Sequence, residues 1–239
     1  MQVKLEELVN IKEIRDKVRK ELGLSESYVV QAPPAKVKTE LLSLKSIGIM
    51  NDMVEMYAKE LNFVSAELDT AQRDLAMPDA SLFVVLKEQE GRLLQLSTLL
   101  GLHITNIADP QSLLTMDSLT YLRLERDWGT FDSWQKDFIA CAIGSKCCAV
   151  TAYSMELKRY MNFIVDDTHP LPLSMVPVIS LCVMPQLYVR DYLNDTKSYV
   201  FAMMKELNWD KVEDRVNRAE RVAAAYEGRN YELRFRESS

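Results

Sequence analysis

The chain has 239 residues, enough for one large domain or two small ones whose core needs no disulfide. It holds only seven Gly and eight Pro, and a protein of many strands would need more of both for its turns. The apolar fraction of 48% and the charged fraction of 27% exclude a wholly disordered chain. The net charge of −6 argues against a surface that binds nucleic acid over its whole extent.

Residues 1–24 predict an amphipathic helical arm that ends at Gly23. The arm carries the main basic cluster of the chain, a candidate for contact with the phosphates of nucleic acid. The cluster consists of Arg15, Lys17, Arg19 and Lys20. A solvated helix face is the alternative interpretation. A Pro-Pro pair then predicts a linker over residues 25–38.

Residues 39–101 carry the strongest pattern, in which apolar residues alternate at spacings of three and four. The first seam consists of Ile47, Met50, Val54, Tyr57, Leu61, Val64, Leu68, Ala71 and Leu75. Pro78 cannot continue the helix, and a second seam runs from Leu82 to Leu100. We therefore predict a long antiparallel hairpin that resembles a coiled coil. His103, at its end, is expected to be partly exposed near a helix C-terminus.

A second apolar stripe lies off the first seam, and one hairpin partner cannot cover both faces. The stripe consists of Ile49, Met53, Met56 and Phe63. We expect it to contact either the rest of the chain or another subunit.

Residues 112–228 predict a helical bundle. Apolar spacing favours a helix over 134–164, and the segment 168–189 has no charged residue. Its four prolines argue against a membrane span, so we expect a proline-broken helix in the protein core. Residues 229–239 alternate apolar and charged side chains, which predicts an extended tail that docks through one face. The docking candidates are Tyr231, Leu233 and Phe235. A frayed terminus is the alternative.

Residues for chemistry are few. The chain has two His and four Cys, with no CxxC pair, phosphate-binding glycine loop or nucleophile elbow. We therefore predict no catalytic, cofactor-binding or metal-binding residues. Neighbouring thiols at Cys147 and Cys148, within an apolar run, suit a reducing compartment, and no secretion signal precedes them. We expect a cytoplasmic protein.

Two segments resemble known families. Asp166 and Asp167, followed by Asn194, Asp195 and Ser198, are similar to the two metal-binding motifs of class I terpenoid synthases. That resemblance implies an all-α, magnesium-dependent enzyme that uses Asp166 and Asp167. The sequence departs from it because the third acid of the first motif is missing and Ala202 replaces the final Glu of the second.

The segment PDASLFVVLKEQEGRLLQLSTLLGL resembles the helical oligomerisation hairpin of bacteriophage small terminase subunits. Those subunits form rings and present DNA to a packaging motor, so this resemblance implies a DNA-packaging adaptor. No recognisable helix-turn-helix precedes the segment.

Together these features predict an all-α helical bundle, built on the long hairpin and ending in a short extended tail. The predicted function is a non-enzymatic assembly or interaction subunit that oligomerises or scaffolds a larger complex. Its predicted partners are itself and other protein subunits, with nucleic acid at the N-terminal arm as a further candidate. The DNA-packaging adaptor and the metal-dependent enzyme remain the alternatives.

Overall fold

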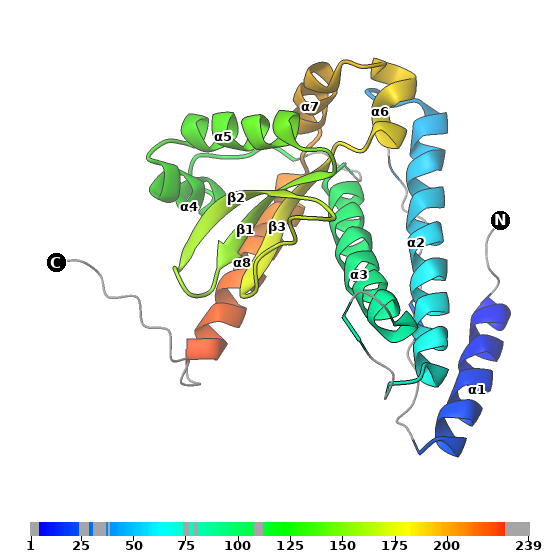
Figure 1. The fold of residues 1–239 in the computed structure, drawn as a ribbon. Coiled ribbons are helices and arrows are strands. Elements are labelled where there is room, and N and C mark those ends of the chain that lie inside the picture. Colours follow the sequence, from blue (N-terminus) through cyan, green and yellow to red (C-terminus); the bar gives the residue numbers. More distant parts are fainter. Residues whose placement is uncertain are drawn as a thin grey trace. The chain divides into compact units, whose positions relative to one another are not determined.

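The fold is taken from a computed structural model, which describes residues 5–23, 29–30, 37, 39–73, 77–78, 81–107 and 112–227 (Figure 1). The side chains are described from Lys12 onward. The helices are α1 (Leu5–Glu21), α2 (Leu44–Thr70), α3 (Leu82–Ile107), α4 (Leu119–Trp128), α5 (Phe131–Gly144), α6 (Pro185–Tyr192), α7 (Thr196–Lys205) and α8 (Trp209–Glu227). The strands are β1 (Cys148–Ser154), β2 (Arg159–Val165) and β3 (Met175–Cys182). The predicted tail, with Tyr231, Leu233 and Phe235, lies outside the described residues.

The chain divides into two compact units. Unit 1 comprises Met1–Pro34 and Asp52–Ser97, and unit 2 comprises Ala35–Asn51 and Thr98–Ser239. Helices α2 and α3 each have residues in both units. No helix among the described residues is both long and apolar enough to cross a membrane.

Unit 1 contains most of the predicted helical hairpin, formed by α2 and α3. The seam residues Leu61, Val64 and Leu68 are buried on α2, as are Leu93 and Leu96 on α3. The spacing of three and four predicts this burial correctly, because it places these side chains on one stripe of each helix.

Helix α1 is bonded to the end of α2 through charged groups. Arg15 donates from Nε to Asp69 Oδ2 at 3.1 Å and from a terminal nitrogen to Ser65 Oγ at 2.8 Å. Arg19 donates to the other oxygen of the Asp69 carboxylate. Arg15 and Asp69 are both buried, so each charge needs the other as its partner.

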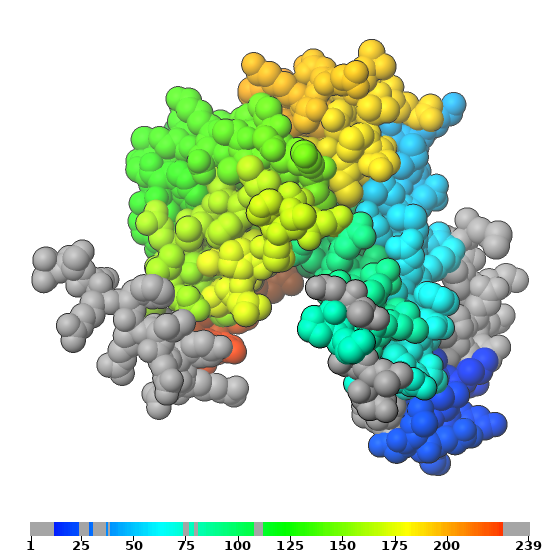
Figure 2. Space-filling model, in the orientation of Figure 1, coloured from blue at the N-terminus to red at the C-terminus, as the bar shows by residue number. Residues whose placement is uncertain are grey.

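Unit 2 holds a three-stranded antiparallel sheet in the order β2-β1-β3. Helices α4, α5 and α8 pack against it. In the space-filling view, α4, α5 and the sheet form one continuous body (Figure 2). The prediction of an all-α fold is therefore wrong, and the helix predicted over 134–164 ends at Gly144.

The sequence pattern did not predict strands β1 and β2, and the reason is physical. All seven residues of β1 are buried, so the strand lacks the alternation of apolar and polar residues that marks a half-buried strand. The turn into β2 has no Gly, because Lys158 takes the left-handed conformation at φ 53°. A scarcity of glycine therefore did not prevent this hairpin from forming.

The uncharged segment 168–189 is also not the predicted broken helix. It contains β3 and the start of α6, which begins at Pro185, a position where the missing N–H costs nothing. Pro177 lies where the register between β1 and β3 shifts, next to Thr151 and Ala152. Proline is tolerated at such an irregularity because no ladder bond is required there.

The hairpin core gives a first testable prediction. Replacing Leu61 with Ala should lower the free energy of unfolding by about 2–5 kcal/mol, because it leaves a cavity in a fully buried site. Leu44, on the same helix and 87% exposed, is the matched control, and Leu44→Ala should change stability by less than about 0.5 kcal/mol. Urea denaturation followed by circular dichroism measures both. Equal effects of the two substitutions would contradict the hairpin packing.

Candidate functional site

The only buried histidine among the described residues lies at the centre of unit 2. The imidazole of His103, on α3, is 1% exposed. Its Nε2 lies 3.2 Å from the hydroxyl of Tyr199 on α7, and the ring also bonds the backbone of Ser180 on β3. The Tyr199 hydroxyl donates to the carbonyl of Cys182 at 3.0 Å. A hydrogen-bonded centre therefore joins α3, β3 and α7.

Burial sets the protonation of this centre. It lowers the pKa of His103 to about 4, so the imidazole is neutral at neutral pH. Burial also raises the pKa of Tyr199 well above its ordinary value. The expectation of a partly exposed His103 is wrong, because α3 continues to Ile107 and carries the ring into the interior.

A buried arginine supports the same centre from α8. Arg215 donates to the Val178 carbonyl at 3.1 Å and, through shorter bonds, to the side chains of Asn106 and Thr105. Asn106 in turn donates to the Ser180 carbonyl at 2.7 Å. Burial lowers the pKa of Arg215 to about 10, which leaves it charged at neutral pH. The three acceptors are all oxygens of α3 and β3, so Arg215 connects α8 to both elements.

Three thiols adjoin the centre at the end of the sheet. Cys148 and Cys182 are register partners on β1 and β3, and the sulfurs of Cys147 and Cys148 lie 3.7 Å apart. Hydrogen bonds to the Cys147 and Cys182 side chains, together with burial, raise the pKa of Cys148 well above its ordinary value. A protonated, buried thiol is a poor nucleophile and a poor ligand.

The pH dependence of stability tests the state of His103. Unfolding returns the imidazole to a pKa near 6.5, against about 4 when folded, so the unfolded chain binds the proton first as pH falls. The stabilising effect of the neutral ring should be complete above pH 6.5. It should be lost between pH 6.5 and 4, by an amount on the order of 3 kcal/mol.

Urea titrations at several pH values would measure this contribution in wild type and in His103→Gln. The variant should lose that part of the slope, whereas His169→Gln, at an exposed position, should keep it. An unchanged slope in His103→Gln would contradict a buried neutral imidazole.

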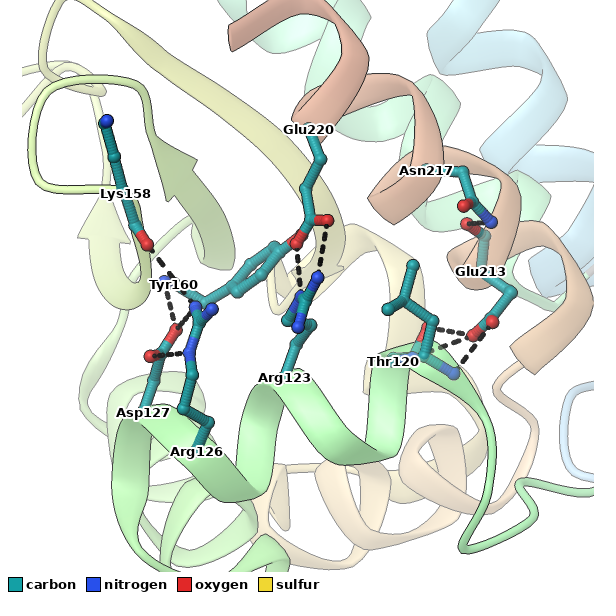
Figure 3. Close-up of polar contacts among 10 residues, drawn as sticks. Thr120, Arg123, Arg126, Asp127, Lys158, Tyr160, Glu213, Asn217 and Glu220 are labelled. Carbon is teal, nitrogen blue, oxygen red and sulfur yellow. Dashed lines mark hydrogen bonds and ion pairs between the residues drawn. The ribbon is translucent and has the colours of Figure 1, made fainter. Parts of the chain in front are cut away.

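A second polar network joins α4 to α8 and β2 (Figure 3). Glu213 on α8 accepts from the backbone N–H groups of Leu119 and Thr120, both at 2.9 Å, and thereby caps α4. Two turns further along α8, the carboxylate of Glu220 accepts a bidentate pair of hydrogen bonds from Arg123, at 2.6 and 3.1 Å. Such paired contacts fix orientation as well as distance.

The network continues to Tyr160, near the start of strand β2. Asp127 accepts from Arg126 at 2.7 and 2.8 Å and from the backbone N–H of Tyr160 at 2.7 Å. The Tyr160 hydroxyl lies 3.3 Å from Glu220 Oε1, and burial, followed by the charge of Glu220, raises its pKa. Every carboxylate of this network accepts a hydrogen bond from another group of the protein. This is typical of a network that stabilises the fold.

This arrangement predicts the effect of removing Glu213. Glu213→Ala should lower the free energy of unfolding by about 1–3 kcal/mol, because it leaves two backbone N–H groups at the start of α4 without an acceptor. Thermal or urea unfolding measures the loss. Asp210→Ala, in the first turn of the same helix, is the control and should cost less. A loss equal to that of the control would contradict the capping role.

The sequence-predicted interaction stripe is only partly accessible. Met56 and Phe63 are 43% and 64% exposed, whereas Met53 is buried and Ile49 is half-buried. In the basic cluster, Arg15 and Arg19 bond Asp69, while Lys17 and Lys20 are exposed. Contact of this arm with nucleic acid stays a prediction.

The acidic residues of the terpenoid-synthase resemblance have local structural roles. Asp166 Oδ1 accepts from the backbone N–H groups of Thr168 and His169, both at 2.8 Å, and bonds to Thr168 lower the Asp166 pKa. Asp195 caps α7 by accepting from the backbone N–H of Ser198 at 2.9 Å. Among the described residues, no three His, Cys, Asp or Glu side chains gather where they could hold a metal ion. The all-α metal enzyme is thus a wrong prediction.

Sequence reasoning missed Tyr199, Asn106 and Arg215. The one available signal is Arg215 itself, which stands beside Val212 and Val216 on the apolar stripe of α8. A charged residue at such a position requires internal partners, but the sequence does not say which.

Comparison with known proteins finds similarity to one family of proteins. The profile described as "Iron/manganese superoxide dismutases, C-terminal domain" matches residues 111–215, less than half of the chain. The manganese superoxide dismutase of Neurospora crassa mitochondria is 29% identical over 96 residues, 38% of this chain and 39% of the relative. A manganese superoxide dismutase of Halobacterium salinarum is 28% identical over 98 residues, 41% of this chain and 49% of the relative.

A third relative matches over a longer span. The iron superoxide dismutase of Cupriavidus metallidurans is 28% identical over 161 residues, 66% of this chain and 79% of the relative. In the first two relatives the matched part is less than half of the protein.

These comparisons overturn the functional prediction. The proteins to which the chain is similar are named as superoxide dismutases, which are enzymes, so the prediction of a non-enzymatic assembly subunit is wrong. None of these names supports the DNA-packaging adaptor, and the coiled-coil and phage assignments fall with it.

Proposed function

We propose that this chain is a divergent homologue of the iron/manganese superoxide dismutases, an oxidoreductase family that acts on superoxide. One observation carries the proposal. The matched residues 111–215 coincide with α4, α5, the whole sheet, α6, α7 and the first part of α8. A likeness that covers all three strands of a sheet and the helices packed on it is what descent of a domain produces.

The names of the relatives imply iron or manganese, and the residues of this chain do not fit either metal. Both metals take imidazole and carboxylate ligands. The chain has two His in all, and the described residues bring no third ligand-type side chain together with any pair. We therefore propose for this chain the domain and the common descent, and we derive no metal-dependent step from its residues.

An experimental structure of the full chain tests the homology. The expected result is the antiparallel order β2-β1-β3 with α5 and α8 packed on it, overlaying the C-terminal domain of an iron or manganese superoxide dismutase. A continuous helix through residues 148–165 would overturn the proposal.

We further propose that the chain associates with itself through the exposed part of the stripe, Met56 and Phe63. Both side chains lie on α2, seven residues apart, and thus on one face of the helix. Apolar side chains gathered on one face are typical of contact surfaces. The four free cysteines, three of them buried, favour a reducing compartment such as the cytoplasm.

Light scattering after gel filtration tests the self-association. The full chain should elute at a multiple of its 27.5 kDa, and a double Met56→Ser, Phe63→Ser variant should elute as a monomer. Leu173→Ser is the matched control, since Leu173 is 93% exposed and lies elsewhere in the chain, and it should leave the mass unchanged. A wild-type monomer at micromolar concentration would contradict this proposal.

A further inference from the structure

Two buried side-chain oxygens of unit 2, Ser174 Oγ and Glu206 Oε2, have no hydrogen-bond partner among the described residues, and neither belongs to a group of side chains that could hold a metal ion. The strongest candidate for a ligand is His103, the single histidine that is buried. Its two bonding directions are taken by Tyr199 at 3.2 Å and by the backbone of Ser180. A metal at Nε2 would have to displace the Tyr199 hydroxyl from the only ring nitrogen that is not bonded to the main chain.

The thiols nearest to this histidine do not complete a ligand set. Cys148 and Cys182 are hydrogen-bonded to each other, and Ser180 Oγ also lies 3.8 Å from the Cys182 sulfur. Both are fully buried among apolar side chains. Sulfur ligands bind as thiolates, and soft thiolates suit zinc, copper(I) and iron–sulfur clusters better than a manganese ion.

Four carboxylates of the unit are bonded to donors of the protein. Glu213 caps α4, Glu220 is bonded by Arg123, and Asp127 is bonded by Arg126. Asp191 accepts from the backbone N–H of Ser43 at 2.9 Å. None of these carboxylates belongs to a metal-competent group within the described part of the chain.

The second histidine lies on the surface. His169 Nδ1 is 3.0 Å from Asp166 Oδ1 in an exposed turn. That carboxylate oxygen also accepts from Thr168, so the pair forms part of the turn. Two adjacent groups in solvent make at most a weak and unselective site for a transition metal.

We infer that this homologue holds neither iron nor manganese, and that the bonds of His103 to Tyr199 and Ser180 form a closed structural centre in the interior of its superoxide-dismutase-type domain. The inference rests on the proposed homology, because only that homology raises the expectation of a metal. It concerns the donor atoms of the chain and their partners, which are fixed by α3, β3 and α7.

Metal content is the direct test. The full chain should be produced in cells grown with added manganese or added iron, dialysed without chelator and analysed by mass spectrometry for both metals. We expect less than about 0.1 metal per chain. MnCl₂ or ferrous ammonium sulfate at 1 mM should move the midpoint of thermal unfolding by less than about 1 °C, and EDTA should leave it unchanged, since a ligand that binds only the folded state must stabilise it.

Variants separate a structural histidine from a ligand. Tyr199→Phe keeps the imidazole but removes its hydroxyl partner, and His103→Gln removes the imidazole itself. Both should lower the unfolding midpoint without changing the metal content. His169→Gln is the surface control and should change neither.

Stoichiometric iron or manganese in the wild type, retained in Tyr199→Phe and lost in His103→Gln, would overturn the inference. Stoichiometric metal in both the wild type and His103→Gln would also overturn the inference, because the metal ligands would then be residues other than His103. Neither result would disturb the homology, which is decided by the order of the strands. A structure without the β2-β1-β3 sheet would remove the homology while leaving the metal measurement as it stands.

Discussion

Burial of strand β1 along its whole length is the constraint on which the rest of unit 2 depends. A strand covered on both faces can leave no backbone or side-chain polar group without an internal partner. The Trp134 indole therefore donates to Thr151 on β1 at 3.1 Å, and Thr151 donates to Asn162 on β2 at 2.7 Å. The aromatic side chains beside Trp134 complete the cover, with Phe138 and Trp209 at ring distances of 5.6 and 5.9 Å.

The same constraint fixes the chemistry of the interior. Burial disfavours charge, so the imidazole of His103 is held neutral and the Tyr199 hydroxyl is held protonated. Arg215 is the exception, and it is stabilised because its guanidinium donates to three oxygens of α3 and β3. A buried polar network whose members bond to one another in this way gains rigidity.

The sequence allowed the hairpin to be predicted but not the sheet, because the two differ in how local their signals are. Leu61 and Leu68 owe their burial to a spacing that repeats within one helix. By contrast, Val150 and Thr151 are both buried, so β1 shows no period of two, and its apolar run fits a helical spacing equally well. At the buried centre, His103 and Tyr199 are 96 residues apart, and nothing near either residue indicates the other.

A packed core and a metal site restrict a sequence differently. A packed core accepts many apolar side chains at a site as long as volume and patterning are kept. A metal site requires specific atoms at specific distances, and replacing one ligand is enough to lose it. An identity of 28% over 98 residues, as with the Halobacterium salinarum relative, leaves room for a core to be kept while individual side chains differ. Within unit 2, Glu213, Glu220 and Asp127 accept hydrogen bonds from N–H groups of α4 and β2 and so stabilise the domain.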